Sequence, residues 1–293
     1  MNREHLAKLI ATYEKPSRKA VSTQLPVLKK PIILTRRFAK KVQNITNLKI
    51  ARKKSAVFFV CVIARHQSVL LRKLGDSEER LQKNKITNLK RACEDLNGLI
   101  IKPRKIFSLW ETIGQPTYHR GYVDGMLLAN GKVVEGVGGG LCQLSNLLCW
   151  LLLHADTKIV ERYHHSLDVF PDSGRVLPFG SGATCLYNFV DLKIKNSGKQ
   201  PLQLKIWVTD KHLKAQLLSP EPAREKLSLQ EKNHAFIKKG KKFFRYNEIW
   251  RTKKIEGKES GRELIFQNFA PVLYKINEKE IRDNGYEFFE IKI

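Results

Sequence analysis

The chain has 293 residues, of which 42% are hydrophobic and 28% charged, a composition typical of folded globular proteins and unlike that of disordered or fibrous chains. Its 54 lysines and arginines outnumber its 28 aspartates and glutamates, so the net charge is +26, which attracts nucleic acid, anionic lipid or anionic wall polymer without selecting among them. The five cysteines are odd in number and widely spaced, which argues against a disulfide framework and predicts at least one free thiol.

The N-terminal segment carries no recognisable export signal. Its first 25 residues contain no continuous apolar stretch, which a secretory signal peptide requires. The longest apolar runs, at residues 56–64 and 147–153, are well short of the roughly 20 residues that cross a bilayer. We therefore expect no transmembrane span and a cytoplasmic location, with association with the cell envelope left open.

The first elements in chain order are a basic arm, a strand and a helix. Residues 1–54 are rich in lysine and arginine and form either an arm that binds an anionic polymer or membrane surface, or a solvated extension. The apolar run 56–64 predicts a buried strand. Apolar positions near helical spacing predict an amphipathic helix over about 77–97, capped by Asp76 or Ser77 and ended by Gly98.

The middle of the chain predicts short strands and a second helix. Residues 99–114 read as a strand–turn–strand unit, and Asn130-Gly131 between two apolar runs predicts a hairpin within 121–136. The segment at about 141–154 is apolar on nearly every face, which is typical of a buried central helix.

The remaining segments lean towards strands. Residues 157–170 predict a strand with a polar end, and 183–198 and 200–219 alternate apolar and polar residues. We divide the chain into the arm 1–54, a domain 55–220 and a basic β-leaning extension 221–293. The predicted fold class is α+β, with a mixed or antiparallel sheet packed on the helices at about 141–154 and 77–97.

The stretch GVGGGLCQLSNLLCW at residues 136–150 places Cys142 at the start of the predicted buried helix. The positive end of the helix dipole and the unpaired N–H groups of its first turn stabilise a thiolate, and the same groups could bind an oxyanion. The preceding glycines allow close approach to the backbone. The alternative is an ordinary core cysteine, as we expect for Cys149, which lies two turns and about 10 Å further along, too far for a disulfide.

A nucleophilic thiol requires a base, and His164 and His165 end the strand predicted after this helix. Strand alternation directs at most one of them towards Cys142, and an exposed histidine pair is an equal alternative. The spacing of Cys142 and Cys149 is not a usual zinc pattern, and no phosphate-binding or dinucleotide motif is present. We therefore expect no metal and no cofactor.

Six segments, within residues 56–220, occur in a recognisable order: NLKRACEDLNGLIIKP (88–103), FSLW (107–110), GGGLCQLSN (138–146), ERYHHS (161–166), GSGAT (180–184) and DLKIKN (191–196). They resemble the VanW family, whose GGGxCQxS pattern is distinctive, and the chain resembles the family's short members. Some VanW domains are understood to be L,D-transpeptidases that cross-link peptidoglycan stem peptides through a cysteine acyl-enzyme. The resemblance thus implies that Cys142 is the nucleophile, and the family's ERHxHS pattern selects His165 as the base. It also aligns the family's serine with Ser166, which we expect to take part in binding the oxyanion or the substrate.

We also expect neighbouring residues to take part in binding. Backbone N–H groups around Gly140–Gln143, together with Gly138 and Gly139, could hold the oxyanion. The amide of Gln143 could add a donor or could instead cap the helix. Arg162 could pair with a carboxylate of an acidic stem peptide or be a surface cation.

Two further positions bear on the site. Asp191 could orient the base or be structural. The family commonly has G-x-D-A-T where this chain has Gly182 in place of the acid, so any role of that carboxylate is lost. The expected partners are peptidoglycan or its precursors. The competing hypothesis is a protein without enzymatic activity that binds an anionic polymer, either a wall component or a nucleic acid, through its basic surface.

Overall fold

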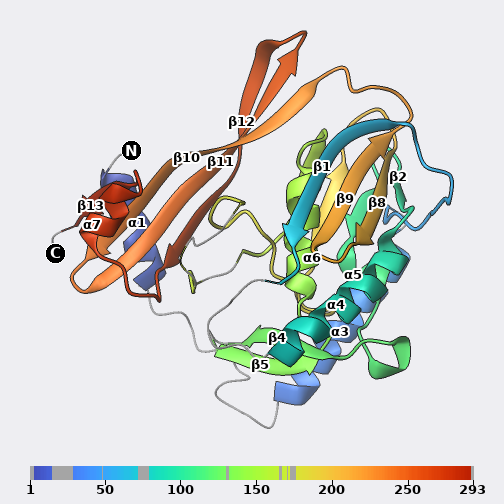
Figure 1. The fold of residues 1–293 in the computed structure, drawn as a ribbon, viewed down its shortest axis with the longest axis horizontal. Coiled ribbons are helices and arrows are strands. Elements are labelled where there is room, and N and C mark those ends of the chain that lie inside the picture. Colours follow the sequence, from blue (N-terminus) through green and yellow to red (C-terminus); the bar gives the residue numbers. More distant parts are fainter. Residues whose placement is uncertain are drawn as a thin grey trace.

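The computed structural model describes residues 3–14, 29–47, 49–71, 79–129, 132–164, 167–169, 171 and 176–291. Helices and mainly antiparallel sheets are combined in it (Figure 1), which confirms the predicted α+β class. The strands of the described residues form four separate sheets rather than one.

The central sheet is antiparallel and has the order β1-β9-β8-β2. Its strands are β1 (Cys61–Val69), β2 (Ile100–Ile101), β8 (Leu202–Val208) and β9 (His212–Ser219). The prediction of a buried strand over 56–64 was wrong in position and in burial. Val57 and Val60 are 80% and 83% exposed, and β1 begins only at Cys61 and alternates in exposure, because one of its faces packs on a helix and the other faces solvent.

Two helices cover this sheet, as predicted. These are α4 (Glu79–Leu96), which contacts β8, and α6 (Leu141–Leu152), which contacts β1 and β9. Gly98 ends α4 with a φ of +83°, a left-handed conformation that favours glycine, whereas the predicted cap at Asp76 or Ser77 lies outside the described residues. Leu144, Leu147 and Leu148 are almost fully buried, so α6 is the central helix of the core.

The hairpin predicted within 121–136 is present as β4 (Asp124–Ala129) and β5 (Lys132–Val137); its Asn130-Gly131 turn lies outside the described residues. The strand–turn–strand unit predicted at 99–114 differs, because β2 joins the central sheet whereas β3 (Ile106–Ser108) pairs with β7 (Lys193–Asn196) in another.

The third sheet has the order β3-β7-β6. Its other strands are β6 (Thr157–Glu161) and β7 (Lys193–Asn196), and α5 (Leu109–Ile113) and the short 3-10 helix η2 (Tyr118–Arg120) follow β3. The strand predicted over 183–198 is therefore limited to its last part. Before it, residues 184–190 form two isolated bridges, Tyr163 with Thr184 and Leu186 with Val190.

The C-terminal part is a sheet, in agreement with its predicted β character. The strands β10 (Lys226–Lys239), β11 (Lys242–Ile255) and β12 (Lys258–Pro271) form a long antiparallel ribbon (Figure 1), and β13 (Glu287–Glu290) pairs with β10 in parallel after α7 (Glu278–Asp283). The division at residue 220 stays a prediction.

This C-terminal sheet is held to the rest of the protein by buried arginines. The Arg251 guanidinium is 2% exposed and donates to the carbonyl oxygens of Leu153, Ala155 and Thr157, immediately after α6. Because one guanidinium joins the carbonyl oxygens that follow α6 to the first residue of β6, Arg251 stabilises the junction between these two elements.

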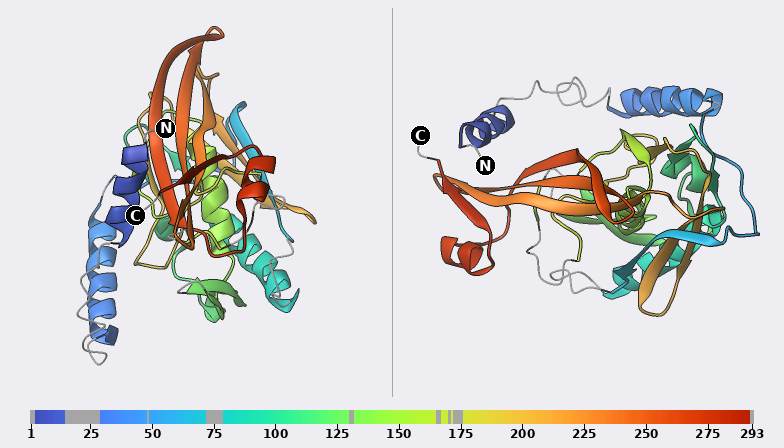
Figure 2. Two further views of the ribbon diagram at one scale, coloured as in Figure 1. Left: turned by 90° about the vertical axis from the view of Figure 1, so that its left-hand side faces the viewer. Right: turned by 90° about the horizontal axis from the view of Figure 1, so that it is seen from above.

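The basic arm contains the helices α1 (Arg3–Glu14) and α3 (Lys29–Thr46). Leu6 and Ile10 of α1 pack with Ile237, Phe244 and Tyr246 of the C-terminal sheet. Figure 2 shows α3 along the outside of the molecule. Within the described residues, no helix combines the length and apolar character needed to cross a membrane.

Candidate functional site

Cys142 is the second residue of α6, as the sequence predicted. The helix is preceded by Gly140, whose φ of +94° lies in the region that favours glycine. The glycine before it has a different reason to lack a side chain, since a Cβ on Gly139 would lie 2.0 Å from the carbonyl carbon of Gly125. These glycines therefore allow α6 to start against the β4–β5 hairpin.

The N–H groups of these glycines are already used. Those of Gly138, Gly139 and Gly140 each donate to a carbonyl in or next to the β4–β5 hairpin, at 3.0 to 3.1 Å. The N–H groups of Leu141 and Cys142 belong to the first turn of α6 and have no acceptor within the helix. An oxyanion at the Cys142 thiol would therefore be bound by these two groups rather than by the glycines.

Cys142 faces a second cysteine that we did not predict as part of the site. The Sγ atoms of Cys142 and Cys185 are 3.9 Å apart, and both residues are partly buried. Donation from the Cys185 thiol, opposed by burial and assisted by the Cys185 backbone, lowers the pKa of Cys142, whereas the same contact and burial raise the pKa of Cys185. The contact therefore favours the thiolate form of Cys142 and the protonated form of Cys185.

Ser145, one turn along α6, fixes the segment that carries Cys185. Its hydroxyl lies 2.5 Å from the carbonyl oxygen of Ala183, to which it donates, and it is fully buried. Gln143 is also engaged: its amide donates to Ser68 Oγ at 2.9 Å and to the Val69 carbonyl at 2.8 Å. The Gln143 side chain thus ties α6 to the end of β1 in this structure.

Arg162 is bound within the protein. Its guanidinium donates to the carbonyl oxygens of Gly180 and Gly182 and lies 3.7 Å from the centroid of the Phe266 ring. Burial is the main reason that the pKa of Arg162 is lowered. A substrate carboxylate would have to share the guanidinium with these carbonyls, so the structure gives Arg162 the role of holding the 180–182 loop against β12.

The candidate base His165 and the neighbouring Ser166 lie outside the described residues, so their predicted roles stay predictions. His164 is described; it is exposed and bonds to the backbone of Phe269. Among the residues that the structure describes, no histidine forms a hydrogen bond with Cys142.

Asp191 borders the site and is fully buried. Its carboxylate accepts hydrogen bonds from Ser108 Oγ at 2.6 Å and from the Trp110 N–H at 3.2 Å. Burial raises the pKa of Asp191 to about 6, against the effect of these two donors. These bonds cap α5, so Asp191 has a structural function whether or not it also orients a base.

Gly182, which replaces the acid common in the family, has a steric explanation. A Cβ at this position would lie 2.1 Å from Asn146 Oδ1. That oxygen accepts a hydrogen bond from the Ala183 N–H at 2.8 Å. Asn146 on α6 therefore occupies the space that a side chain at 182 would need, while its amide fixes the loop beside Cys185.

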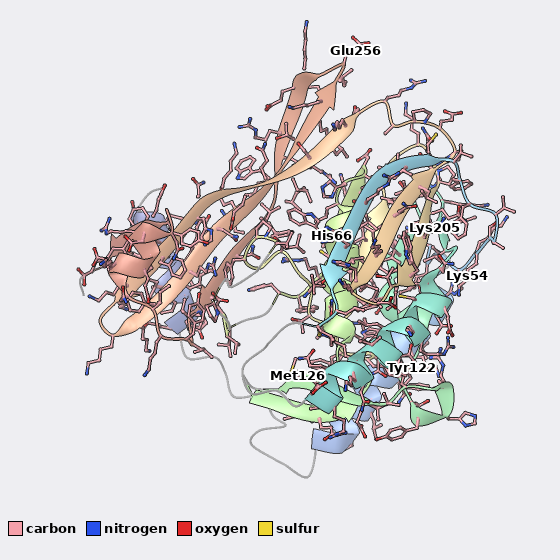
Figure 3. The ribbon with its side chains drawn as sticks, viewed as in Figure 1. Lys54, His66, Tyr122, Met126, Lys205 and Glu256 are labelled. Carbon is pink, nitrogen blue, oxygen red and sulfur yellow. The ribbon has the colours of Figure 1, made fainter. Side chains whose placement is uncertain are left out.

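Two histidines lie near α6, and burial favours the neutral form of both. His66 is on β1, beside α6 (Figure 3), and burial together with His154 lowers its pKa to about 4. The Nδ1 atom of His154 is 2.9 Å from the Trp150 carbonyl, and burial lowers its pKa as well. This pair belongs to the packing of the C-terminal half of α6, away from its first turn.

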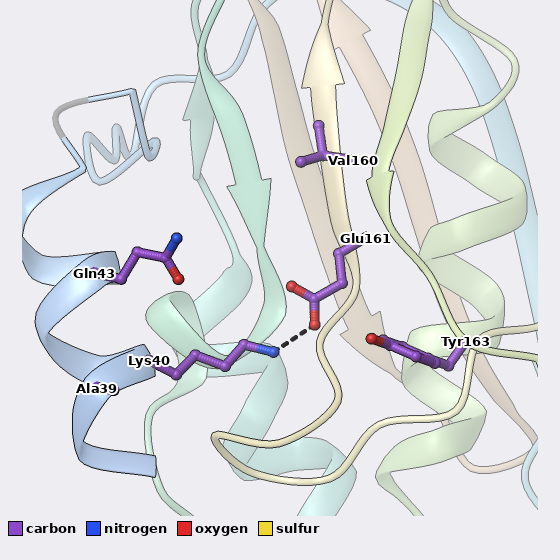
Figure 4. Close-up of a pocket in the computed structure, with 6 residues that line it drawn as sticks. All are labelled: Ala39, Lys40, Gln43, Val160, Glu161 and Tyr163. Carbon is purple, nitrogen blue, oxygen red and sulfur yellow. Dashed lines mark hydrogen bonds and ion pairs between the residues drawn. The ribbon is translucent and has the colours of Figure 1, made fainter. Parts of the chain in front are cut away.

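Two adjoining hollows lie between α3 and the β6 edge. One, of about 610 Å³, is lined by Lys40, Glu161 and Tyr163 among others (Figure 4), and the second, of about 440 Å³, shares Lys40 and Tyr163 with it. Lys40 Nζ is 2.5 Å from Glu161 Oε1. Cys142 lines neither hollow. In the described part of the chain, no group of histidines, cysteines and carboxylates is arranged to hold a metal ion.

Cys185 was missed because its proximity to Cys142 depends on contacts across 43 positions of sequence. The signal available in the sequence was the position of a cysteine directly after the GSGAT segment, which the resemblance already placed in the domain. Without the fold, nothing linked that segment to the start of α6.

Comparisons with known proteins agree with the resemblance. Residues 84–218 match the family described as VanW like protein. The chain is 29% identical over 199 residues to the vancomycin B-type resistance protein VanW of Enterococcus faecalis, covering 67% of this chain and 72% of that protein. It is 28% identical over 123 residues to the uncharacterized protein YoaR of Bacillus subtilis, covering 42% of this chain and 39% of that protein. No solved structure matches. These similarities therefore support a VanW-like region at residues 84–218 of the chain.

Proposed function

We propose that the protein is a cysteine acyltransferase of the cell wall, with peptidoglycan stem peptides as substrates and Cys142 as nucleophile. The observation that carries the proposal is the environment of Cys142 at the first turn of α6. There the Cys185 thiol and the N–H groups of Leu141 and Cys142, which have no acceptor within the helix, favour negative charge, first on sulfur and then on the oxygen of an intermediate. The similarity to a vancomycin resistance protein supports a role connected with the wall.

The reaction would proceed in two steps. The Cys142 thiolate attacks the carbonyl carbon of a peptide bond in the donor stem, and the N–H groups of Leu141 and Cys142 bind the resulting oxyanion. The C–N bond breaks, the leaving amine takes from the base the proton that the base had received from the Cys142 thiol, and a thioester remains on Cys142. An acceptor amine then attacks the thioester, loses its proton to the base and releases the thiolate.

The base in this scheme is His165, the residue that the family pattern selects. A histidine fits the task because its ordinary pKa lies near neutrality and it can both accept and return a proton.

The test is a transpeptidation assay with the purified full chain and disaccharide-tetrapeptide muropeptides. Mass spectrometry should detect dimers with a 3–3 cross-link, and Cys142→Ala should abolish them. Cys61→Ala provides the matched control, because Cys61 lies on β1 with its Sγ 3.6 Å from the Pro220 carbonyl and should leave the yield unchanged. Absence of cross-linked product from the wild-type chain, or equal product from Cys142→Ala, would contradict the proposal.

A further inference from the structure

Cys142 and Cys185 are held face to face by two different elements. Cys142 is fixed by α6, and Cys185 lies between the Tyr163–Thr184 and Leu186–Val190 bridges. Their Sγ atoms are 3.9 Å apart. A disulfide bond is about 2.05 Å long, so the sulfurs need to approach by roughly 2 Å. The distance is short enough for small changes of side-chain torsion and of the 184–190 segment to close it.

The other cysteines have no such arrangement. Cys93 and Cys149 are buried in the core, and burial raises the pKa of both thiols, that of Cys93 to about 12. Cys61 is directed at the Pro220 carbonyl. Cys142 and Cys185 are both partly accessible, and the first favours the thiolate form that reacts with disulfides.

We propose that Cys142 and Cys185 form a reversible intramolecular disulfide when the protein meets a small organic disulfide. The Cys142 thiolate attacks one sulfur of the small disulfide, whose S–S bond breaks and releases one thiolate. Cys185 then gives up its proton and attacks Cys142 Sγ, and the second small thiolate leaves. The protein loses two hydrogens and the small disulfide becomes two thiols, so the exchange balances.

The consequence for catalysis rests on the proposed function. While the disulfide is present, Cys142 has no thiolate and cannot form an acyl-enzyme. A small thiol restores both cysteines by the reverse exchange. The pair would therefore switch acyl transfer off under oxidising conditions and protect Cys142 from irreversible oxidation.

The disulfide is tested without any substrate. The reduced full chain is incubated with 2-hydroxyethyl disulfide, its remaining thiols are alkylated with N-ethylmaleimide after denaturation, and its intact mass is measured. The reduced chain should take up five labels, and the oxidised chain two fewer, with residues 142 and 185 joined in the peptide map. Cys185→Ala should instead accumulate a mixed disulfide on Cys142, whereas Cys61→Ala should still form the cross-link.

The outcomes separate the two proposals. If the wild-type chain keeps all its thiols, stops at a mixed disulfide on Cys142 or joins another pair of cysteines, the switch is refuted whatever the activity. If the cross-link forms but the reduced chain has no transpeptidase activity, the switch stands and the proposed function fails. Because the wild-type chain carries the decisive measurement, a Cys185→Ala variant that does not fold leaves the test intact.

A second inference rests on α3, whose exposed side carries an apolar stripe. Leu34 and Phe38, one turn apart, are 63% and 70% exposed, and Val42 continues the same stripe. The opposite side of the helix is polar and faces the protein: Lys40 pairs with Glu161, and Asn44 accepts a hydrogen bond from Lys193 at 2.8 Å. This is the reverse of the usual orientation of a surface helix.

From this orientation we infer that α3 docks on an anionic phospholipid surface. Its sequence KKPIILTRRFAKKVQNIT contains six lysines and arginines and no acidic residue, which is the composition of helices that lie in a membrane interface. The net charge of +26 adds long-range attraction to anionic lipid and opposes a second copy of the chain as the occupant of this face.

The test is sedimentation of the full chain with vesicles of phosphatidylcholine, with or without about one-third phosphatidylglycerol. Binding should require the anionic lipid and weaken as salt is added. Phe38→Ser should weaken it by about tenfold or more, whereas Val57→Ser, which removes an apolar side chain that is 80% exposed elsewhere, should have no effect. Equal binding by both variants, no binding by the wild type, or a dimer that Phe38→Ser dissociates would overturn the inference.

Discussion

Replacement of Asp191 by asparagine should remove a specific dependence of stability on pH. Burial raises the pKa of Asp191 from 3.8 to about 6, and each unit corresponds to about 1.4 kcal/mol. Between these two values the folded protein binds the proton more tightly than the unfolded chain, so the free energy of unfolding falls as pH rises. The full loss is about 3 kcal/mol, and most of it occurs between pH 4 and pH 7.

The assay is urea unfolding of the wild type and of Asp191→Asn at several pH values. Asparagine keeps an acceptor for Ser108 but cannot ionise, so the wild type should lose about 3 kcal/mol relative to the variant as pH rises through this window. The control is Asp210→Asn, in the exposed turn between β8 and β9. Its free energy of unfolding should change with pH in parallel with that of the wild type. Parallel curves for Asp191→Asn and the wild type would refute the assignment of the buried carboxyl.

Two further predictions concern packing around the site. Arg251→Met should lower the free energy of unfolding by about 3 kcal/mol in urea titrations, because three carbonyl oxygens after α6 lose their donor; an unchanged midpoint would contradict the role given to Arg251. Gly139→Ala should cost about 3 kcal/mol or more, since its Cβ would collide with Gly125, whereas Gly240→Ala, with open space and a φ of +58°, should cost only about 1 kcal/mol in thermal melts. Equal losses for the two glycines would show that the close approach at Gly139 is not tight.

The helices could be predicted because their signals are local. The periodic apolar positions of α4, the glycine at its end and the all-round apolar character of α6 depend on neighbouring residues only. The α+β class and the helix start at Cys142 followed from the same signals. The two strands at 100–108 resembled a single unit for the same reason, since local pattern does not reveal that they pair with β8 and β7.

Only the part of the site that depends on neighbouring residues in the sequence could be predicted. The position of Cys142 on α6 could be read from the sequence, whereas the engagement of Arg162 with the 180–182 loop and the contact with Cys185 arise from tertiary packing. The start of β1 was predicted too early, because the apolar run at 56–64 was interpreted as a buried strand. The strand instead begins at Cys61 and continues through alternating residues up to Val69. One-sided burial depends on what covers the strand, here α6.

The most direct test of the central claim is the pH dependence of alkylation at Cys142. The full chain is treated with iodoacetamide at pH values from 5 to 10, and the rate at each cysteine is followed by peptide mass spectrometry. Cys142 should react first, with a midpoint below the ordinary thiol value of about 8.5, and Cys185→Ala should raise that midpoint. A Cys142 midpoint at or above the ordinary value, unchanged by Cys185→Ala, would contradict the assignment of Cys142 as an activated nucleophile.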